Sequence, residues 1–256
     1  MKFVVPSYQR YAEIQEKTLK YLIDQGVPNK SIYIVVREDD KQIEQYRGLK
    51  KDYWGVNVIE TDQKGIGRTH NFITDWAEEG EFIVEMDDDM TNLIDTEKKS
   101  VNFIDACCDM KKMMDEKGAS YGGTYQVDNV MFMKQNPNYT FDLRYLLGCL
   151  RFRFVRKDIV LETNYSEDFE NCILHYIRDG IIVKNNHICP KTRNYKKGGC
   201  DDDGRNLITE KTDKEFLANK YPEYCKLFQR KNERWDLRLK HKVNRLKTEY
   251  CIVESD

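Results

Sequence analysis

The sequence predicts an α/β fold in which helices flank a mostly parallel β-sheet. Four short apolar segments in the first 90 residues are expected to be buried strands, at residues 3–5, 32–36, 56–59 and 81–86. Segments of helical length separate them, and Gly, Pro or Asp residues lie in the connections. Strands that alternate with helices at this spacing indicate βαβ units, whose parallel sheets bind ligands at the carboxyl ends of the strands.

Local patterns predict the helices between these strands. Residues 13–25 place apolar side chains near helical spacing, and Gly26 with Pro28 ends this helix. Asp39 and Asp40 can cap a helix that runs to about residue 49. A Gly-containing loop at residues 65–67 precedes a helix from about residue 68 to residue 78.

The pattern changes after a predicted helix at residues 97–117. Residues 121–124, 130–134 and 146–155 are predicted strands separated by turns, which indicates a small antiparallel sheet. The remaining predicted elements are a helix from residue 166 to before 180, a strand at 181–184, a loop at 189–205 and helices at about 212–221 and 232–248. We therefore divide the chain into a core at residues 1–190 and a basic, mainly helical C-terminal appendage at residues 191–256, which is not an independent domain.

Composition favours a globular protein without a membrane partner. Of the 256 residues, 40% are hydrophobic and 34% are charged, as in ordinary soluble proteins. The apolar runs are too short to span a bilayer, and the first six residues are too weakly apolar for a secretory signal. We therefore expect a cytoplasmic protein, located in a host cell if the chain is of viral or phage origin. The eight cysteines include no C-x-x-C pair, which favours reduced thiols, although Cys189 and Cys200 near His187 leave a zinc site as an alternative.

The net charge of −2 hides an asymmetry along the chain. Residues 191–247 contain 17 Lys and Arg against 9 Asp and Glu, which leaves 25 basic and 35 acidic residues in the rest. A basic C-terminal segment on an acidic body suits a polyanionic partner such as nucleic acid. A solvated basic surface explains the same asymmetry.

The strongest chemical signal is the acidic triplet Asp87, Asp88 and Asp89 at the end of a predicted buried strand. Adjacent carboxylates repel one another unless a cation neutralises them, and their oxygens suit Mg²⁺ or Mn²⁺. A turn or a helix cap would explain an isolated cluster. The loop from Gly65 to Gly67 favours a ligand site, because it follows the preceding strand and opens a helix whose N-terminus, with Arg68, would attract phosphate.

Two further groups follow predicted elements later in the chain. Ser166 is a candidate N-cap, with Glu167 and Asp168 in the first helical turn, where acidic residues oppose the helix dipole. Asp168 in that position can also accept a proton from an attacking hydroxyl. His187 lies just past a strand and can complete a metal shell, although a single histidine is more often structural.

In this order, the features between about residues 2 and 187 resemble GT-A (Rossmann-like) glycosyltransferases, in which a D-x-D motif, an E-D pair and a late histidine share one active site. The resemblance implies that the following residues bind the nucleotide sugar: Val5, Pro6, Ser7, Arg10, Gly65, Gly67, Arg68, Asp87 and Asp88. It implies that Asp89, Asp87 and His187 hold a divalent metal, and that Asp168 is the general base of an inverting enzyme.

A narrower resemblance concerns phage and viral glycosyltransferases that act on hydroxymethylated pyrimidines in DNA, among them the TET-associated glycosyltransferases. It is carried by the compact size, the K-K-G-G-C sequence at residues 196–200 and the basic tail. It implies transfer of glucose from UDP-glucose, with manganese or magnesium, to a 5-hydroxymethylpyrimidine in double-stranded DNA. The residues expected to hold the DNA backbone are Arg193, Lys196, Lys197, Arg205, Arg230, Arg234 and Arg238, and Tyr195 and Trp235 could stack on exposed bases or pack against the body.

Three other interpretations remain open at this point. One is a GT-A glycosyltransferase that acts on a glycan or a lipid-linked acceptor. Another is a nucleotidyltransferase, which would usually have a Gly-rich basic motif after the first strand, where this chain has P-S-Y-Q-R-Y at residues 6–11. The third is a non-catalytic nucleic-acid-binding module derived from a glycosyltransferase, against which the intact acidic motifs argue.

Overall fold

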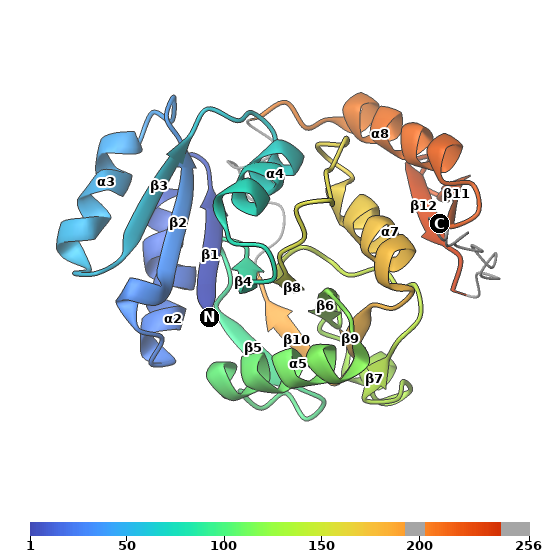
Figure 1. Ribbon diagram of the computed structural model, residues 1–256, viewed down its shortest axis with the longest axis horizontal. Helices are drawn as coiled ribbons and strands as arrows, with labels where there is room; N and C mark the ends of the chain where they lie inside the picture. Colours follow the sequence, from blue (N-terminus) through green and yellow to red (C-terminus); the bar gives the residue numbers. More distant parts are fainter. Residues whose placement is uncertain (193–202, 242–256) are drawn as a thin grey trace, which may run out of the picture.

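The computed structural model describes residues 1–192 and 203–241. Its centre is an eight-stranded sheet with the strand order β3-β2-β1-β4-β8-β6-β9-β7, and helices pack on the sheet (Figure 1). Two small antiparallel sheets, β10 with β5 and β11 with β12, accompany it. The predicted α/β fold, with a mostly parallel sheet and small antiparallel additions, is confirmed.

The parallel half of the sheet is formed by the predicted apolar segments. Its strands are β1 (Lys2–Ser7), β2 (Ile32–Arg37), β3 (Asn57–Thr61) and β4 (Phe82–Met86), with β1 between β2 and β4. The connecting helices are α1 (Tyr11–Ile14), the π-helix η1 (Gln15–Leu19), α2 (Lys20–Asp24), the 3-10 helix η2 (Asn29–Ser31), α3 (Ile43–Asp52) and α4 (Ile66–Trp76).

Helices cover both faces of these strands because the strand side chains alternate in direction. Phe3 and Val5 of β1 belong to a hydrophobic cluster with side chains of α2 and α3, whereas Val4 belongs to one with Ile73 of α4. Since the four strands are parallel, their carboxyl ends meet at one edge of the sheet, and the predicted motifs meet there too.

The other half of the sheet is mixed. Its strands are β8 (Leu150–Phe154), which is antiparallel to β4, then β6 (Tyr121–Thr124), β9 (Val183–Asn185) and β7 (Tyr139–Thr140). Two helices belong to this half, α5 (Phe103–Lys117) and α7 (Glu167–Asp179). The helix predicted from residue 97 begins only at Phe103, because β5 (Asn92–Asp95) pairs with β10 (Ile188–Lys191) before it and Asn102 caps it.

Residues 130–134, predicted as a strand, form the short helix α6 (Val130–Lys134). The apolar run is misleading here because only Met133 is buried, whereas Met131 and Phe132 are exposed. Asn129 begins the helix, and its side-chain oxygen accepts a hydrogen bond from the Phe132 N–H at 3.4 Å.

The described part of the C-terminal segment contains one helix and one hairpin. Helix α8 (Leu207–Lys220) begins after a capping box at Asn206, earlier than predicted. The prediction of a second helix from about residue 232 is wrong over β12 (Trp235–Leu239), which pairs with β11 (Cys225–Gln229). Leu237 and Leu239 are buried while Arg238 between them is exposed, which is the period of two expected of a strand. Residues 193–202 and 242–256, with the predicted K-K-G-G-C loop, lie outside the described residues.

The C-terminal elements share a hydrophobic cluster with the body. Leu217 of α8 and Leu237 of β12 pack in one cluster with Tyr121 of β6 and Ile173 of α7. Burial of apolar surface stabilises by about 25 cal/mol per Å², so this packing holds the hairpin against the body. Among the described residues, no helix combines the length and apolar character needed to cross a bilayer.

Candidate active site

A cleft of about 1180 Å³ opens at the carboxyl ends of β1 and β4. Pro6, Ser7 and the aspartates that follow β4 line one side, and Asp168 of α7 lines another. The strand β12, from the far end of the described chain, also contributes to the lining. One cleft therefore contains residues from the nucleotide-binding part predicted in the core and from the C-terminal segment.

The three aspartates after β4 have different surroundings. Asp87 is exposed to the cleft, and Asp89 lines it with only 4% of its surface accessible. Asp88 accepts a hydrogen bond from Ser7 Oγ at 2.7 Å and one from Arg10 Nη1 at 2.8 Å. Its ion pair with Arg10 is largely buried, since the two side chains are 6% and 15% exposed. Asp88, Ser7 and Arg10 therefore connect the ends of β1 and β4 in the wall of the cleft.

The carboxyl group of Asp87 has a pKa raised to about 7. The main cause is partial shielding of the carboxyl group from water by the walls of the cleft, and the negative charges of Asp89 and Asp88 add to it, while Arg151 acts in the opposite direction. The end of β4 therefore brings three carboxyl groups close enough for their negative charges to act on one another.

This charge fits a hard divalent cation that shares its coordination shell with a phosphorylated ligand. Within residues 1–192 and 203–241, no group of three or more His, Cys, Asp or Glu side chains could hold a metal ion. Asp87 and Asp89 would supply two carboxylates, and Mg²⁺ in proteins is usually held by one or two carboxylates together with substrate phosphates and water. The residues present therefore fit a metal ion whose coordination shell is completed by the oxygens of a diphosphate.

We expect Asp87→Asn to stabilise the metal-free protein at alkaline pH. The pKa of this acid is higher in the folded protein than its ordinary value of 3.8, so ionisation destabilises the fold progressively up to about pH 7. After allowance for solvent screening of an exposed group, the gain at about pH 8 should be about 1 kcal/mol, or about 2–4 °C in melting temperature. Thermal unfolding at about pH 8 and pH 4 measures this, because the gain should vanish at the lower pH.

The matched control for that experiment is Asp109→Asn, which removes a carboxylate from the exposed face of α5. It should leave the melting temperature unchanged at both pH values. A lower melting temperature for Asp87→Asn at alkaline pH would show that Asp87 stabilises the fold and is not under electrostatic strain.

Gly65 and Gly67 allow close packing between two segments of the chain. A Cβ atom on Gly67 would lie 1.9 Å from the carbonyl oxygen of Thr163, and one on Gly65 would lie 2.5 Å from Oδ1 of Asn164. Gly65 also has a φ of +96°, which favours glycine. Gly65 lines the cleft and Gly67 does not, so the loop is needed first to seat α4 against residues 163–164.

The N-terminal end of α4 holds a carboxylate from the C-terminal segment. Asp203 Oδ2 accepts a hydrogen bond from the Gly65 N–H at 2.8 Å, and Asp203 Oδ1 pairs with Arg37. Tyr165 Oη donates to the carbonyl oxygen of Asp203 at 2.5 Å. A helix N-terminus favours an anion, and here Asp203 supplies it. Arg68 is exposed and does not line the cleft.

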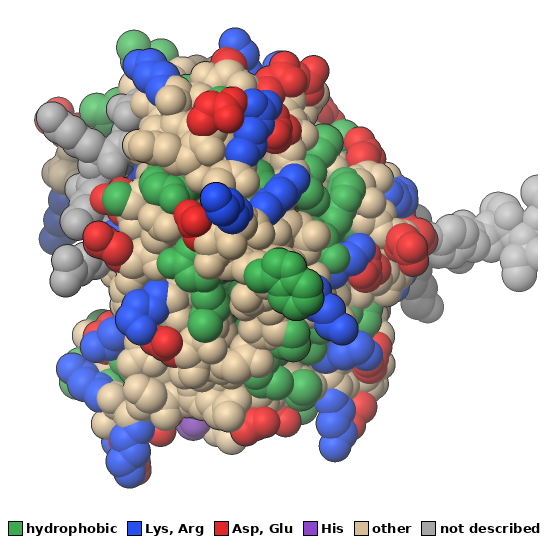
Figure 2. Space-filling view, turned by 90° about the vertical axis from the view of Figure 1, so that its left-hand side faces the viewer, with side chains coloured by type: hydrophobic (Ala, Val, Ile, Leu, Met, Phe, Trp, Pro, Cys, Tyr) green, Lys and Arg blue, Asp and Glu red, His purple; other side chains and the backbone are tan. Residues whose placement is uncertain are grey.

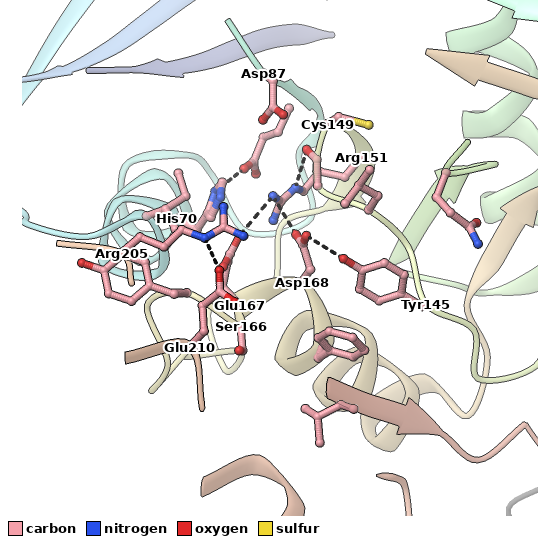
Figure 3. Close-up of a pocket in the computed structure, with 18 of the residues that line it drawn as sticks. His70, Asp87, Tyr145, Cys149, Arg151, Ser166, Glu167, Asp168, Arg205 and Glu210 are labelled. Atoms are coloured by element: carbon pink, nitrogen blue, oxygen red, sulfur yellow. Dashed lines mark hydrogen bonds and ion pairs between the residues drawn. The ribbon is translucent and has the colours of Figure 1, made fainter. Parts of the chain in front are cut away.

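Asp168 presents a carboxylate to the cleft from the first turn of α7. Its Oδ1 accepts a hydrogen bond from Arg151 Nη2 at 3.2 Å and its Oδ2 one from Tyr145 Oη at 3.3 Å (Figure 3). Gly148 makes room for this pair, because a Cβ atom there would lie 2.0 Å from Arg151 Nη2 and 2.4 Å from Asp168 Oδ1. Next to it, burial and the charge of Asp168 raise the pKa of Glu167 well above its ordinary value.

Besides Gly67 and Arg68, two further predicted site residues lie outside the cleft lining, and one predicted cap lacks its bond. Val5 is fully buried in the core of β1 and does not line the cleft. His187 also lies outside the lining, and its Nε2 is 3.1 Å from the carbonyl oxygen of Asn136, so the structure does not bring it to the aspartates. Ser166 occupies the N-cap position of α7 without a side-chain capping bond. Cys189 is buried, and Cys200 lies outside the described residues.

A buried polar network that was not predicted from the sequence lies beside the cleft. Glu85 of β4 is 1% exposed, pairs with Arg153 Nε and lies 2.7 Å from His70 Nδ1. Arg153 Nη1 also donates to Thr74 Oγ1 at 2.6 Å. Burial alone would raise the pKa of Glu85, but Arg153 and His70 outweigh it and hold the pKa well below its ordinary value.

Burial lowers the pKa of His70 to about 4, so its imidazole is neutral at physiological pH. A signal for this network was present in the sequence. Glu85 interrupts the apolar run F-I-V-E-M, and Arg151 and Arg153 alternate with apolar residues in L-R-F-R-F. Charged residues within buried strands are expected only with partners.

A family match covers most of the chain that builds this cleft. Residues 1–175 match the TET-Associated Glycosyltransferase family. The chain belongs to this family. The matched residues include the aspartates after β4 and Asp168, and the glycosyltransferase activity predicted from the motifs is confirmed at the level of the family. No curated protein matches the sequence.

Solved structures similar to this TET-associated glycosyltransferase share its fold. Staphylococcus aureus TarS 1-349 in complex with UDP-GlcNAc has a TM-score of 0.57 and 17% identity, covering 86% of this chain and 66% of its own. Mycobacterium tuberculosis glucosyl-3-phosphoglycerate synthase with Mn²⁺, UDP and phosphoglyceric acid has a TM-score of 0.52 and 12% identity, covering 94% and 86%.

The mannosyltransferase PcManGT from Pyrobaculum calidifontis, in complex with GDP-Man and Mn²⁺, has a TM-score of 0.50 and 14% identity, covering 72% of this chain and 56% of its own. The chain thus spans slightly less than two thirds of the TarS 1-349 chain and 40% of the longer TarS chain. At these identities the similarity shows the GT-A fold, as predicted, and nothing more specific.

Proposed function

We propose that this chain transfers glucose from UDP-glucose to the hydroxymethyl group of a 5-hydroxymethylpyrimidine, such as 5-hydroxymethylcytosine, in double-stranded DNA. One observation carries the proposal. A single cleft joins the aspartates after β4 to the carboxylate of Asp168, and a basic hairpin forms part of its lining. Donor, base and polyanionic acceptor can therefore meet in one place.

The donor would lie across the carboxyl ends of β1 and β4. Pro6 and Ser7 line the cleft there and would contact the nucleoside. Val5 is buried in β1 beside them, and Arg10 pairs with Asp88 in the same wall of the cleft. A divalent cation between Asp87 and Asp89 would offset the negative charge of the leaving diphosphate. Three structural neighbours support this choice of ligands, since they contain UDP-GlcNAc, UDP with Mn²⁺, or GDP-Man with Mn²⁺. Arg68 and His187 lie outside the cleft and have no role in this proposal.

Asp168 would act as the general base of an inverting transfer. Arg151 and Tyr145 each hold one of its carboxylate oxygens, which fixes the orientation of the group. The acceptor hydroxyl would give its proton to Asp168 while its oxygen bonds to the anomeric carbon. The bond from that carbon to the β-phosphate oxygen breaks, and UDP leaves with the electron pair.

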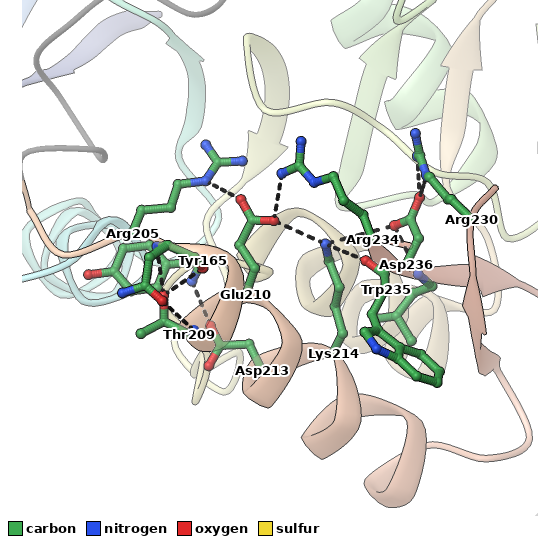
Figure 4. Close-up of polar contacts among 12 residues, drawn as sticks. Tyr165, Arg205, Thr209, Glu210, Asp213, Lys214, Arg230, Arg234, Trp235 and Asp236 are labelled. Carbon is green, nitrogen blue, oxygen red and sulfur yellow. Dashed lines mark hydrogen bonds and ion pairs between the residues drawn. The ribbon is translucent and has the colours of Figure 1, made fainter. Parts of the chain in front are cut away.

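The C-terminal elements make the cleft positive on the acceptor side. Four cations, Arg205, Lys214, Arg230 and Arg234, share two carboxylates, Glu210 and Asp236 (Figure 4). Arg238 lines the same cleft and stacks on Phe228 at 4.9 Å. At the opposite end of the molecule, around α3, basic and acidic side chains are intermingled (Figure 2). A polyanion would therefore be attracted to the cleft side.

A base in a duplex would have to leave the stack to reach Asp168. Trp235 lies in the cleft lining, and Lys211 Nζ lies 5.2 Å from the centroid of its ring. This ring could stack on the base that leaves the duplex or on the partner base that it leaves behind. The other predicted DNA contacts, Arg193, Tyr195, Lys196 and Lys197, lie outside the described residues.

The experiment that tests the function is a panel of nucleotide sugars incubated with Mn²⁺ and three acceptor classes. These are hydroxymethylcytosine DNA, hydroxymethyluracil DNA and simple or lipid-linked glycans, with product mass and UDP release as readouts. We expect transfer from UDP-glucose to DNA. Transfer only to glycans would replace the DNA acceptor, and DNA binding without any nucleotide release would show a non-catalytic module.

Removing two hairpin arginines should weaken DNA binding by reducing its electrostatic contribution. Each phosphate that the protein no longer neutralises reduces the slope of log K against log salt by about 1. Arg234→Ala with Arg238→Ala should therefore reduce that slope by about 2 in titrations of labelled duplex. Arg47→Ala on α3 is the control, because its side chain does not line the cleft and is 46% exposed. An unchanged slope in the double variant would exclude phosphate binding by β12.

A further inference from the structure

Lys184 is a buried cation in the lining of the cleft. It lies on β9, and only 5% of its surface is exposed. Lysine is rarely buried unless it is paired, because removal of the ammonium group from water is costly. The position of Lys184 therefore requires a compensating negative charge, either in the protein or in a ligand.

The described partners of Lys184 are all neutral. Its Nζ donates to Gln126 Oε1 and, at 3.2 Å, to the carbonyl oxygen of Tyr145, and it lies 5.0 Å from the ring centroid of Tyr125. Within residues 1–192 and 203–241, no carboxylate oxygen lies within 4.0 Å of this Nζ. Burial lowers the pKa of Lys184 to about 8, so the ammonium group is still charged at neutral pH.

A second cation lines the same part of the cleft. Arg144 has a side chain that is 34% exposed, and its Nε donates to Asp142 Oδ1 at 2.8 Å. Its charge is close enough to lower the pKa of Lys184 further, whereas the charge of Asp142 raises it. The two cations line the same cleft, and the nearby carboxylate of Asp142 pairs with Arg144.

Tyr145 connects this cationic pair to the proposed base. Its carbonyl oxygen accepts the hydrogen bond from Lys184, and its Oη lies 3.3 Å from Asp168 Oδ2. An anion held by Lys184 would therefore lie near Asp168, beside the acceptor position. It would belong to the acceptor and not to the donor diphosphate.

We propose that Lys184, together with Arg144, binds a phosphate group that the acceptor carries close to the hydroxyl group that receives the sugar. This inference rests on the proposed function only in taking Asp168 as the base. A phosphate supplies the negative charge that the neutral partners of Lys184 lack, and its oxygens can accept a further hydrogen bond from the ammonium group. A neutral glycan would not supply this charge. A phosphodiester of a DNA strand and the phosphomonoester of a free nucleotide present the same chemistry.

Binding of inorganic phosphate tests the site without any turnover. The probe is titrated calorimetrically into the full chain saturated with UDP and Mn²⁺, so that the donor subsite is occupied. Lys184→Met should weaken phosphate binding at least tenfold, Lys184→Arg should restore most of it, and Lys112→Met on the exposed face of α5 should leave it unchanged. Equal phosphate affinity in the wild type and in folded Lys184→Met would overturn the proposal.

Acceptor kinetics then identify the source of the phosphate. Hydroxymethylcytosine oligonucleotides carry a neutral methylphosphonate at one flanking position at a time, and 5-hydroxymethyl-dCMP is compared with its nucleoside. A strand phosphodiester is the ligand if one methylphosphonate raises KM about tenfold in the wild type and no further in Lys184→Met. A phosphomonoester is the ligand if no methylphosphonate changes KM, whereas 5-hydroxymethyl-dCMP has a KM about tenfold lower than its nucleoside in the wild type and not in Lys184→Met. A KM that responds to neither change in the wild type would contradict the proposal.

The two hypotheses can fail separately. Phosphate binding that depends on Lys184, in a protein that releases no UDP with any acceptor, would retain the anion site and reject the proposed transfer. Glucosylation of DNA with a KM that is the same in the wild type and Lys184→Met would retain the transfer and reject the anion site.

Discussion

Replacement of Asp89 by alanine is expected to lower kcat/KM for UDP-glucose about 10³-fold, equivalent to about 4 kcal/mol of transition-state stabilisation. Asp89 lines the cleft beside Asp87, and these are the two carboxylates proposed to hold the cation, whereas Asp88 is held by Ser7 and Arg10. The measurement is UDP release, together with calorimetric affinity for UDP with and without Mn²⁺. The variant should lose only the part of the affinity that Mn²⁺ provides.

Two comparisons make this result specific to the metal site. Asp109→Ala, which removes an exposed carboxylate from α5, should leave both UDP release and the Mn²⁺ dependence unchanged. Circular dichroism should show that Asp89→Ala remains folded, since the substitution also removes a like charge next to Asp87. A folded Asp89→Ala protein with full turnover would end the proposal of a metal at the end of β4.

The second large effect is expected for Asp168→Asn, which should reduce transfer by about 10²–10⁴-fold. Asparagine keeps the size of the side chain and its contact with Tyr145 Oη, but it cannot take a proton from the acceptor hydroxyl. Because Asp168 lies on the acceptor side, the affinity for UDP and Mn²⁺ should stay within about twofold of the wild type. Single-turnover transfer and UDP calorimetry separate these two quantities.

Asp158→Asn is the matched control for this substitution. Asp158 is 63% exposed and pairs with Arg178 near the C-terminal end of α7, so its replacement should affect neither transfer nor UDP affinity. A decrease in UDP affinity in Asp168→Asn, in parallel with activity, would indicate that Asp168 shapes the donor site through Arg151 and is not the base.

The position of the candidate site could be predicted from the sequence, but the roles within it could not. The apolar run before Asp87 predicts a buried strand, and βαβ order then places the triplet at the sheet edge where ligands bind. Which aspartate the protein itself holds depends on Ser7 and Arg10, which lie about 80 positions earlier and reach Asp88 only through the pairing of β1 with β4. No local pattern contains that information.

The role of the two glycines also could not be predicted from local sequence. Gly65 and Gly67 predict a ligand loop, whereas the closest obstacles to a side chain are Thr163 and Asn164, nearly a hundred residues later. By contrast, the strand β12 could have been predicted from its own sequence. The alternation of Leu237, Arg238 and Leu239 has the period of a strand, and the high charge of the segment obscured it.

The lining contributed by β12 has a consequence for how members of this family can diversify. The family match ends at residue 175, and the strand that shapes the far side of the cleft begins at Trp235. Under the proposed function, the donor residues lie within the family match, whereas part of the surface that would contact the DNA lies beyond it. Exchange of residues 207–239 between two relatives with the same first 175 residues should therefore change the DNA-contacting surface and leave the donor site in place.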